Sequence, residues 1–225
     1  MADELHLRLG PRFEDALTFA ARIHAGDKRK QTDIPYIAHP LGVCALVLLD
    51  GGGEDEAVAA LLHDTLEDHP ALAPPEVIAG RFGDKVLAIV RECSDTGDDY
   101  TGGDKDPWPD RKQRYLDHLP HATPEALRVS LADKVDNSRA ILSDYRRVGD
   151  ALWERFSRGK TEQLAYYGRL VARFKDAGAR GFLFDELSRT VAELVALVAE
   201  SDGGRPEPED APEARQDPEW PATGR

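Results

Sequence analysis

Apolar residues recur at the spacing of an α-helix along almost the whole of this chain. Within residues 11–25, for example, Phe13, Ala16, Leu17 and Ala20 fall on one helical face. No segment alternates apolar and polar residues strongly enough to be assigned as a half-buried strand. The pattern therefore predicts an all-α fold.

Turn and capping residues divide this pattern into separate helices. Gly83 interrupts the segment 74–93, which is therefore expected to form two helical pieces. Thr123 is placed to cap a helix at 124–142, with Pro124 at its first position. The other helices are expected at 11–25, 41–50, 54–68, 111–119, 149–178 (one long helix or a kinked pair) and 182–200.

Length and composition indicate one folded domain followed by a tail. A chain of 225 residues is typical of a single domain. Residues 201–225 are dominated by proline and acidic residues, with only isolated apolar ones, which is typical of disorder. We therefore expect a folded domain at 1–200 and a disordered, acidic, proline-rich tail at 201–225. The sequence does not indicate the oligomeric state.

Charge, hydropathy and cysteine use limit the partners and the location. A formal net charge of −13 repels phosphate backbones, so nucleic acid is not expected as a partner. No apolar run approaches the roughly 20 residues of a membrane helix, so no membrane association is expected. The acidic N-terminus lacks a signal-peptide pattern, and Cys44 and Cys93 stand alone, which fits a reducing cytoplasm.

The stretch "AALLHDTLED" at residues 59–68 places four polar side chains directly after an apolar run. On a continuous helix the apolar residues share the core face, and the other side carries His63, Asp64, Glu67 and Asp68. An imidazole and a carboxylate on adjacent residues can reach one cation where a helix borders a cleft. Taken alone, a solvated acidic face with an incidental histidine explains this stretch equally well.

Two other segments supply partners for these side chains. His39, in "PYIAHP", lies at a loop-to-helix junction, and Asp133, in "LADKVDN", follows an apolar lead-in. A carboxylate close to the core needs a partner, and Lys134 is expected to project elsewhere on the helical wheel. Asn137 lies one turn beyond Asp133 on the same face.

The combined set contains two imidazoles and two carboxylates: His39, His63, Asp64 and Asp133. This mixture of nitrogen and hard oxygen donors suits Mn²⁺, Fe²⁺ or Zn²⁺ better than Mg²⁺ or Ca²⁺. An ion held there would lower the pKa of a coordinated water. The expected site is therefore a metal centre with positions left for water and substrate.

The order H…HD…D is the ligand pattern of HD-domain phosphohydrolases. Four stretches, "GDKRKQTDIPYIAHPLGV", "AALLHDTLED", "FGDKVLAIVRECSD" and "SLADKVDNSRAI", make the chain resemble the RelA/SpoT-type hydrolases, specifically the small stand-alone ones without a synthetase domain. The resemblance extends from about residue 10 to about residue 175. It implies an HD-domain helical bundle that cleaves (p)ppGpp at its 3′ side and releases pyrophosphate.

The resemblance also implies a role for each matched side chain. The two-histidine, two-carboxylate set would hold Mn²⁺, although Fe²⁺ or Zn²⁺ would fit the same donors. Glu67 and Asp68 would position or deprotonate the attacking water. Arg29 and Lys30 would face the phosphates or the base of a small phosphorylated nucleotide, and Asn137 would contact its sugar or a phosphate.

Departures from the family pattern leave alternatives open. His69 and Pro70 follow the ED pair where the stand-alone hydrolases usually continue with threonine, and residues 96–115 form an acidic insert with Tyr100 and Trp108. The insert is either a lid or base-stacking wall, or an ordinary mobile loop. The substrate could then be another nucleotide, such as NADPH or a nucleoside monophosphate, and a non-catalytic nucleotide sensor is a third interpretation.

Overall fold

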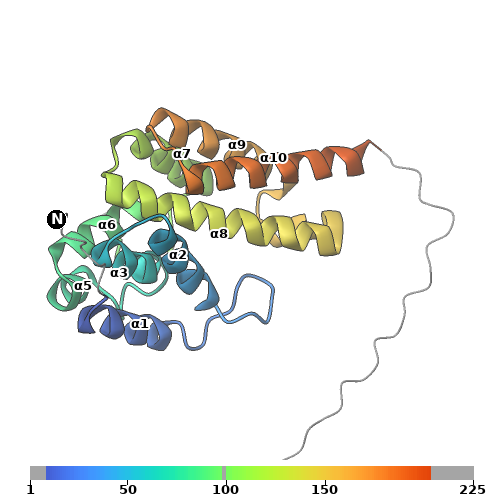
Figure 1. Cartoon of the computed structure of the whole chain (residues 1–225). Coiled ribbons are helices and arrows are strands. Elements are labelled where there is room, and N and C mark those ends of the chain that lie inside the picture. The colour runs from blue at the N-terminus through green and yellow to red at the C-terminus, as the bar shows by residue number, and fades with distance from the viewer. Residues whose placement is uncertain (1–8, 98–99, 204–225) are drawn as a thin grey trace, which may run out of the picture.

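The computed structural model describes residues 9–97 and 100–203, and its helices surround one long helix, α8 (Pro124–Val148) (Figure 1). Three helices pack against one side of α8: α2 (Ala38–Leu49), α3 (Glu54–Leu62) and α6 (Asp84–Cys93). On the other side α10 (Phe182–Asp202) lies along it. The remaining elements are α1 (Pro11–Ile23), α4 (Thr65–Asp68), α5 (Pro75–Phe82), α7 (Trp108–His118), α9 (Gly159–Asp176) and the 3₁₀-helices Leu119–His121 and Gly149–Arg155.

The prediction of an all-α fold is confirmed. Within residues 9–97 and 100–203 the sole extended pairing is an isolated bridge between Lys28 and Pro35. Gly83 separates α5 from α6 as expected, and it adopts a φ of 95°, which glycine tolerates best. In the described part of the chain, none of the helices combines the length and apolar character needed to cross a bilayer.

Helix α8 begins where its capping residues predict. The Thr123 hydroxyl accepts a hydrogen bond from the Ala126 amide at 3.3 Å and donates one to Glu92 at 3.0 Å. The helix runs past the predicted end at residue 142 to Val148, because Tyr145 is buried and packs against Trp153 with 5.7 Å between ring centroids. Tertiary packing therefore extends a helix whose start is set locally.

The single helix expected at 54–68 is wrong, because the regular helical hydrogen bonding is interrupted at His63 and Asp64, although both residues keep right-handed helical dihedrals. Two side chains bond to nearby backbone carbonyls there: the Thr65 hydroxyl donates to Leu62 O at 2.7 Å, and His63 Nδ1 lies 2.8 Å from Ala60 O. Such local bonds compete with the regular helical ladder. The break separates α3 from the four-residue α4.

The predicted boundary at residue 200 lies inside α10, which continues to Asp202. The rest of the predicted tail, residues 204–225, lies outside the described residues. The division into a folded domain and a disordered tail therefore stays a prediction.

Replacing Thr123 with alanine tests how far the cap stabilises α8. The change removes the acceptor for the Ala126 amide, so the free energy of unfolding should fall by about 1 kcal/mol, measured by urea denaturation. Thr123→Ser keeps the hydroxyl and should stay close to the native value. Equal losses in both variants would show that the methyl group, rather than the cap, is responsible.

Candidate active site

Four potential ligands meet at the centre of the bundle, although they come from separate elements. His39 lies in the first turn of α2, His63 and Asp64 lie at the break between α3 and α4, and Asp133 lies in the middle of α8. His39 Nε2 lies 3.2 Å from Asp133 Oδ1 and 3.5 Å from Asp64 Oδ2. His63 Nε2 lies 3.1 Å from Asp64 Oδ2 and 3.7 Å from Asp133 Oδ1.

The donor atoms fit a bound cation. His39 Nδ1 lies 2.6 Å from Asp136 Oδ2, and His63 Nδ1 faces the Ala60 carbonyl. Both partners are acceptors, so each Nδ1 carries a proton, and each Nε2 points towards the two carboxylates, where it would give its lone pair to a bound ion. Among the described residues His63 Nε2 has no hydrogen-bond partner, although it is buried. A metal ion would satisfy these four atoms at once.

Charge and burial act in opposite directions on these groups. Burial opposes the charged form of His63, but Asp64 and Asp133 outweigh it and raise the pKa of His63 well above its usual value. Burial likewise opposes ionisation of Asp133, but Lys134, followed by His39 and His63, lowers the pKa of Asp133 well below its usual value. The carboxylates are therefore held ionised beside the two imidazoles.

Three neighbours that the sequence analysis did not assign hold the ligands in place. Asp136 Oδ2 joins His39 to Arg29 Nη1, which lies 3.0 Å away. The Tyr36 hydroxyl donates a hydrogen bond to Asp64 Oδ2. The expectation that Lys134 projects elsewhere is wrong, because its ammonium is buried against Asp133 and over the Tyr115 ring.

A sequence signal existed for two of these neighbours. Tyr36 precedes His39 by three residues, and Asp136 follows Asp133 by three, which places each within one helical turn of a ligand. Spacing alone did not distinguish them from the many other polar residues nearby.

Glu67 and Asp68 lie in α4, directly beyond the ligand pair. Glu67 Oε1 accepts hydrogen bonds from the Asp95 amide at 2.7 Å and the Ser94 hydroxyl at 3.1 Å. Lys105 Nζ lies 3.3 Å from both Glu67 Oε2 and Asp68 Oδ1. Burial, followed by nearby carboxylates, raises the pKa of Glu67 and of Asp68, while Lys105 acts to lower both. A carboxylate with a raised pKa is suited to accept a proton near neutral pH.

The predicted site residues border two adjoining cavities. The smaller, of about 230 Å³, is lined by His39, Asp64, Glu67, Asp68 and Asp133, and the larger, of about 400 Å³, is lined by Lys30. Arg29, Tyr36 and Asn137 line both. His63 lies behind the smaller cavity and does not line it.

Two residues that line both cavities, Asn137 and Arg29, are connected by hydrogen bonds to the potential ligand Asp133. Asn137 Nδ2 donates to Asp133 Oδ1 at 2.5 Å, and Arg29 Nη2 donates to Asn137 Oδ1 at 2.8 Å. The larger cavity adds two cations, Arg147 and Arg155. Trp108 takes no part, because it packs against Tyr166 with 5.6 Å between ring centroids. An elongated anion could therefore lie across both cavities.

Comparisons with known proteins agree on the relatives of this chain. Residues 16–158 match the family model of the HD domain. Over 131 residues the chain is 42% identical to the guanosine-3′,5′-bis(diphosphate) 3′-pyrophosphohydrolase MESH1 of Xenopus tropicalis, with 56% of this chain and 68% of that relative covered. The human MESH1 is 38% identical over 131 residues with the same coverage.

The fold also has a solved counterpart. The structure of a metazoan SpoT orthologue that hydrolyses ppGpp matches with a TM-score of 0.65, covering 82% of this chain and 96% of that one. At 23% sequence identity this likeness concerns the fold.

Replacing Gly42 with alanine tests whether the Asp136 carboxylate orients His39. A β-carbon at Gly42 would overlap the end of the Asp136 side chain, which can rotate away but would then leave His39 Nδ1. Loss of such an outer hydrogen bond should weaken Mn²⁺ binding by about tenfold or more, measured by isothermal titration calorimetry.

Gly80→Ala is the matched control, because Gly80 is also helical and a β-carbon there meets no atom within 4 Å. It should bind Mn²⁺ as the native protein does. Unchanged affinity in Gly42→Ala would mean that Asp136 does not hold the imidazole.

Proposed function

The chain belongs to the HD-domain family, and on that premise we propose that it is a metal-dependent hydrolase of ppGpp and pppGpp that releases pyrophosphate from the 3′ position. The observation that carries the proposal is the two-histidine, two-carboxylate set at the smaller cavity, which Glu67 and Asp68 also line and behind which His63 is buried. Relatives named for this reaction support the substrate. We also propose a cytoplasmic location, because Cys44 and Cys93 are unpaired.

Mn²⁺ is the proposed ion, and Fe²⁺ or Zn²⁺ would suit the same donors. His39, His63, Asp64 and Asp133 would hold it. When bound, such an ion supplies positive charge to phosphate oxygens and lowers the pKa of a coordinated water. The choice among these metals is a matter for measurement.

The chain's own acids would handle the proton. Glu67 Oε1 accepts from both the Asp95 amide and the Ser94 hydroxyl, whereas within the described part of the chain Glu67 Oε2 has a single, longer contact with Lys105 Nζ at 3.3 Å, so Oε2 is the atom that would accept a proton from the attacking water. The water oxygen forms a bond to phosphorus, the bond from that phosphorus to the 3′ oxygen breaks, and the 3′ oxygen takes up a proton. From ppGpp the products are pyrophosphate and guanosine 5′-diphosphate. Asp68 would help to position the water.

Local cations would offset the negative charge of the whole chain. Arg29 and Asn137, at the boundary of the two cavities, would contact the 3′ diphosphate, and Lys30 would face a phosphate or the base. The nucleoside would occupy the larger cavity, where Phe156 and Tyr167 offer aromatic surface. The 5′ phosphates would then lie near Arg147 and Arg155, the other two cations of the larger cavity.

Pyrophosphate release from ppGpp by purified protein tests the proposal. Release that requires Mn²⁺, stops with chelator and disappears in Asp64→Ala is the expected result, and the variant excludes a contaminating phosphatase. A panel containing NADPH and nucleoside monophosphates runs in parallel. Equal or faster turnover of one of these would overturn ppGpp as the substrate.

Exchanging Glu67 for glutamine should separate catalysis from metal binding. Glu67→Gln keeps the shape but removes the proton acceptor, so the rate should fall roughly 10²-fold or more while bound Mn²⁺ stays the same by elemental analysis. His63→Ala should instead lose metal and activity together. A retained rate in Glu67→Gln would move the proton-accepting role to Asp68.

Lys105 should influence the pH dependence of the reaction. A base must be deprotonated, so the rate should fall as the pH drops through the raised pKa of Glu67. Lys105→Met removes a nearby cation that lowers this pKa, so the acid limb of the pH–rate profile should move to higher pH. Lys175→Met, at an exposed position of α9, should leave the limb in place. A shift to lower pH would contradict the assignment.

A further inference from the structure

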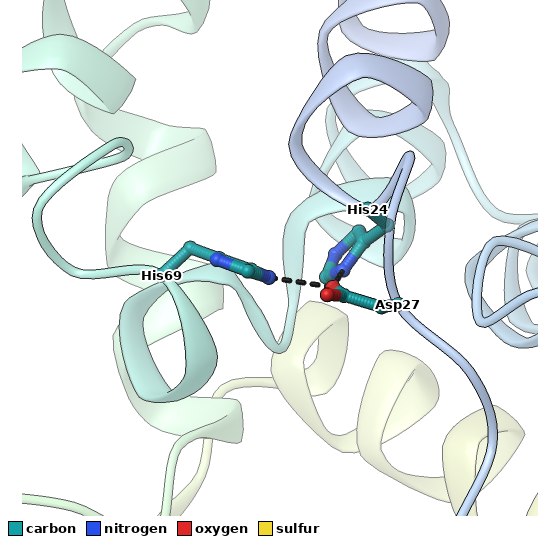
Figure 2. A group of neighbouring side chains, drawn as sticks. All are labelled: His24, Asp27 and His69. Atoms are coloured by element: carbon teal, nitrogen blue, oxygen red, sulfur yellow. Dashed lines mark hydrogen bonds and ion pairs between the residues drawn. The ribbon is translucent and has the colours of Figure 1, made fainter.

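A second group of metal-ligating side chains lies outside the machinery of the proposed reaction. His24 follows the end of α1, Asp27 lies in the next loop, and His69 follows the end of α4 (Figure 2). His24 Nδ1 lies 2.8 Å from Asp27 Oδ2, and His69 Nε2 lies 2.6 Å from the same oxygen. Two imidazoles therefore converge on one carboxylate, one from three residues away in sequence and the other from 42 residues away.

The backbone holds all three positions in place. The Asp27 amide donates to His24 O at 3.1 Å, the Tyr36 amide donates to Asp27 O at 2.9 Å, and the His69 amide donates to Thr65 O at 2.9 Å. The His24 ring also packs against the Tyr36 ring, with 4.9 Å between centroids. The donor atoms are thus brought together by the fold and not by flexible surface side chains.

The three side chains of this second group differ in exposure to solvent: His24 is buried, and Asp27 and His69 are partly exposed. The His24 side chain is 1% exposed, whereas those of His69 and Asp27 are 21% and 33% exposed. Burial opposes ionisation of Asp27, but the hydrogen bonds with His69 and His24 outweigh it and lower the pKa of Asp27. A small cation from solvent would meet an ionised carboxylate and two imidazole nitrogens at this opening.

We propose that His24 Nδ1, Asp27 Oδ2 and His69 Nε2 bind a second divalent transition-metal cation, with Zn²⁺ the best match. Two imidazoles and one carboxylate are a donor set that zinc accepts, with water at the fourth position. Neighbouring donors around tetrahedral zinc lie about 3.3 Å apart, so Asp27 Oδ2 needs to move away from His24 Nδ1 by about 0.5 Å and from His69 Nε2 by about 0.7 Å. The partly exposed side chains of Asp27 and His69 can make this adjustment.

The position of this site suggests what the ion does. It would join the end of α1 to the end of α4, the four-residue helix that carries Glu67 and Asp68. A helix so short has little stability of its own, so a metal cross-link at its last turn would hold it. The expected effect is structural, and it does not depend on which nucleotide the protein cleaves.

Metal stoichiometry of the full-length, tag-free protein tests the proposal. The chelator-treated protein should bind two Zn²⁺ ions per chain by calorimetry and elemental analysis, and His69→Gln and Asp27→Asn should each bind one. His121→Gln removes an exposed histidine from a 3₁₀-helix outside both groups and should still bind two. One ion in the native protein, with no change in His69→Gln, would mean that the three side chains form a hydrogen-bonded array only, and would overturn the proposal.

A variant that lacks the first metal centre tests the second site separately. His63→Ala/Asp64→Ala removes two ligands there and should keep one Zn²⁺, which should raise its melting temperature. Adding His69→Gln should abolish both the bound ion and the rise. A bound ion that persists in the triple variant would assign the second ion elsewhere. Neither measurement uses a substrate, so failure of this proposal is distinct from failure of the proposed reaction.

Discussion

The gathering of two imidazoles and two carboxylates in one small volume, with His39, His63 and Asp133 buried, is the constraint on which the rest of the structure depends. Charged groups inside a protein are costly unless they are paired or bind a cation. Here the surrounding groups reduce that cost: Asp136 accepts from His39, Tyr36 donates to Asp64, and Lys134 contacts Asp133. The same contacts fix the direction of each donor atom, so the fold prepares the centre for an ion.

Two of these four groups lie at the junction of α3 and α4, where His63 and Asp64 keep right-handed helical dihedrals. The expectation that His63 faces away from the core is wrong, because its ring is buried and hydrogen-bonds to Ala60 O. Asp64 borders the smaller cavity. Asp133 meets them because α8 crosses the centre of the bundle, in contact with α2 and α3 (Figure 1).

Tyr36 connects the two groups of metal-ligating side chains. Its hydroxyl donates to Asp64 in the inner centre, and its ring packs against His24 in the outer group. An ion bound by His24, Asp27 and His69 would therefore restrain a neighbour of the inner centre as well as the end of α4. Positive charge at both centres would also reduce the repulsion that a chain of net charge −13 exerts on a phosphorylated nucleotide.

The sequence by itself determined the all-α class, the start of α8 at its threonine cap, the division at Gly83 and the order of the candidate ligands. These features depend on periodicity and capping, which act over one or two helical turns. The tertiary structure alone decided how far α8 continues beyond residue 142, that Lys134 turns towards Asp133, and that His69 meets Asp27. Such contacts join segments far apart in the chain or arise where packing overrides local preference, so no local pattern contains them.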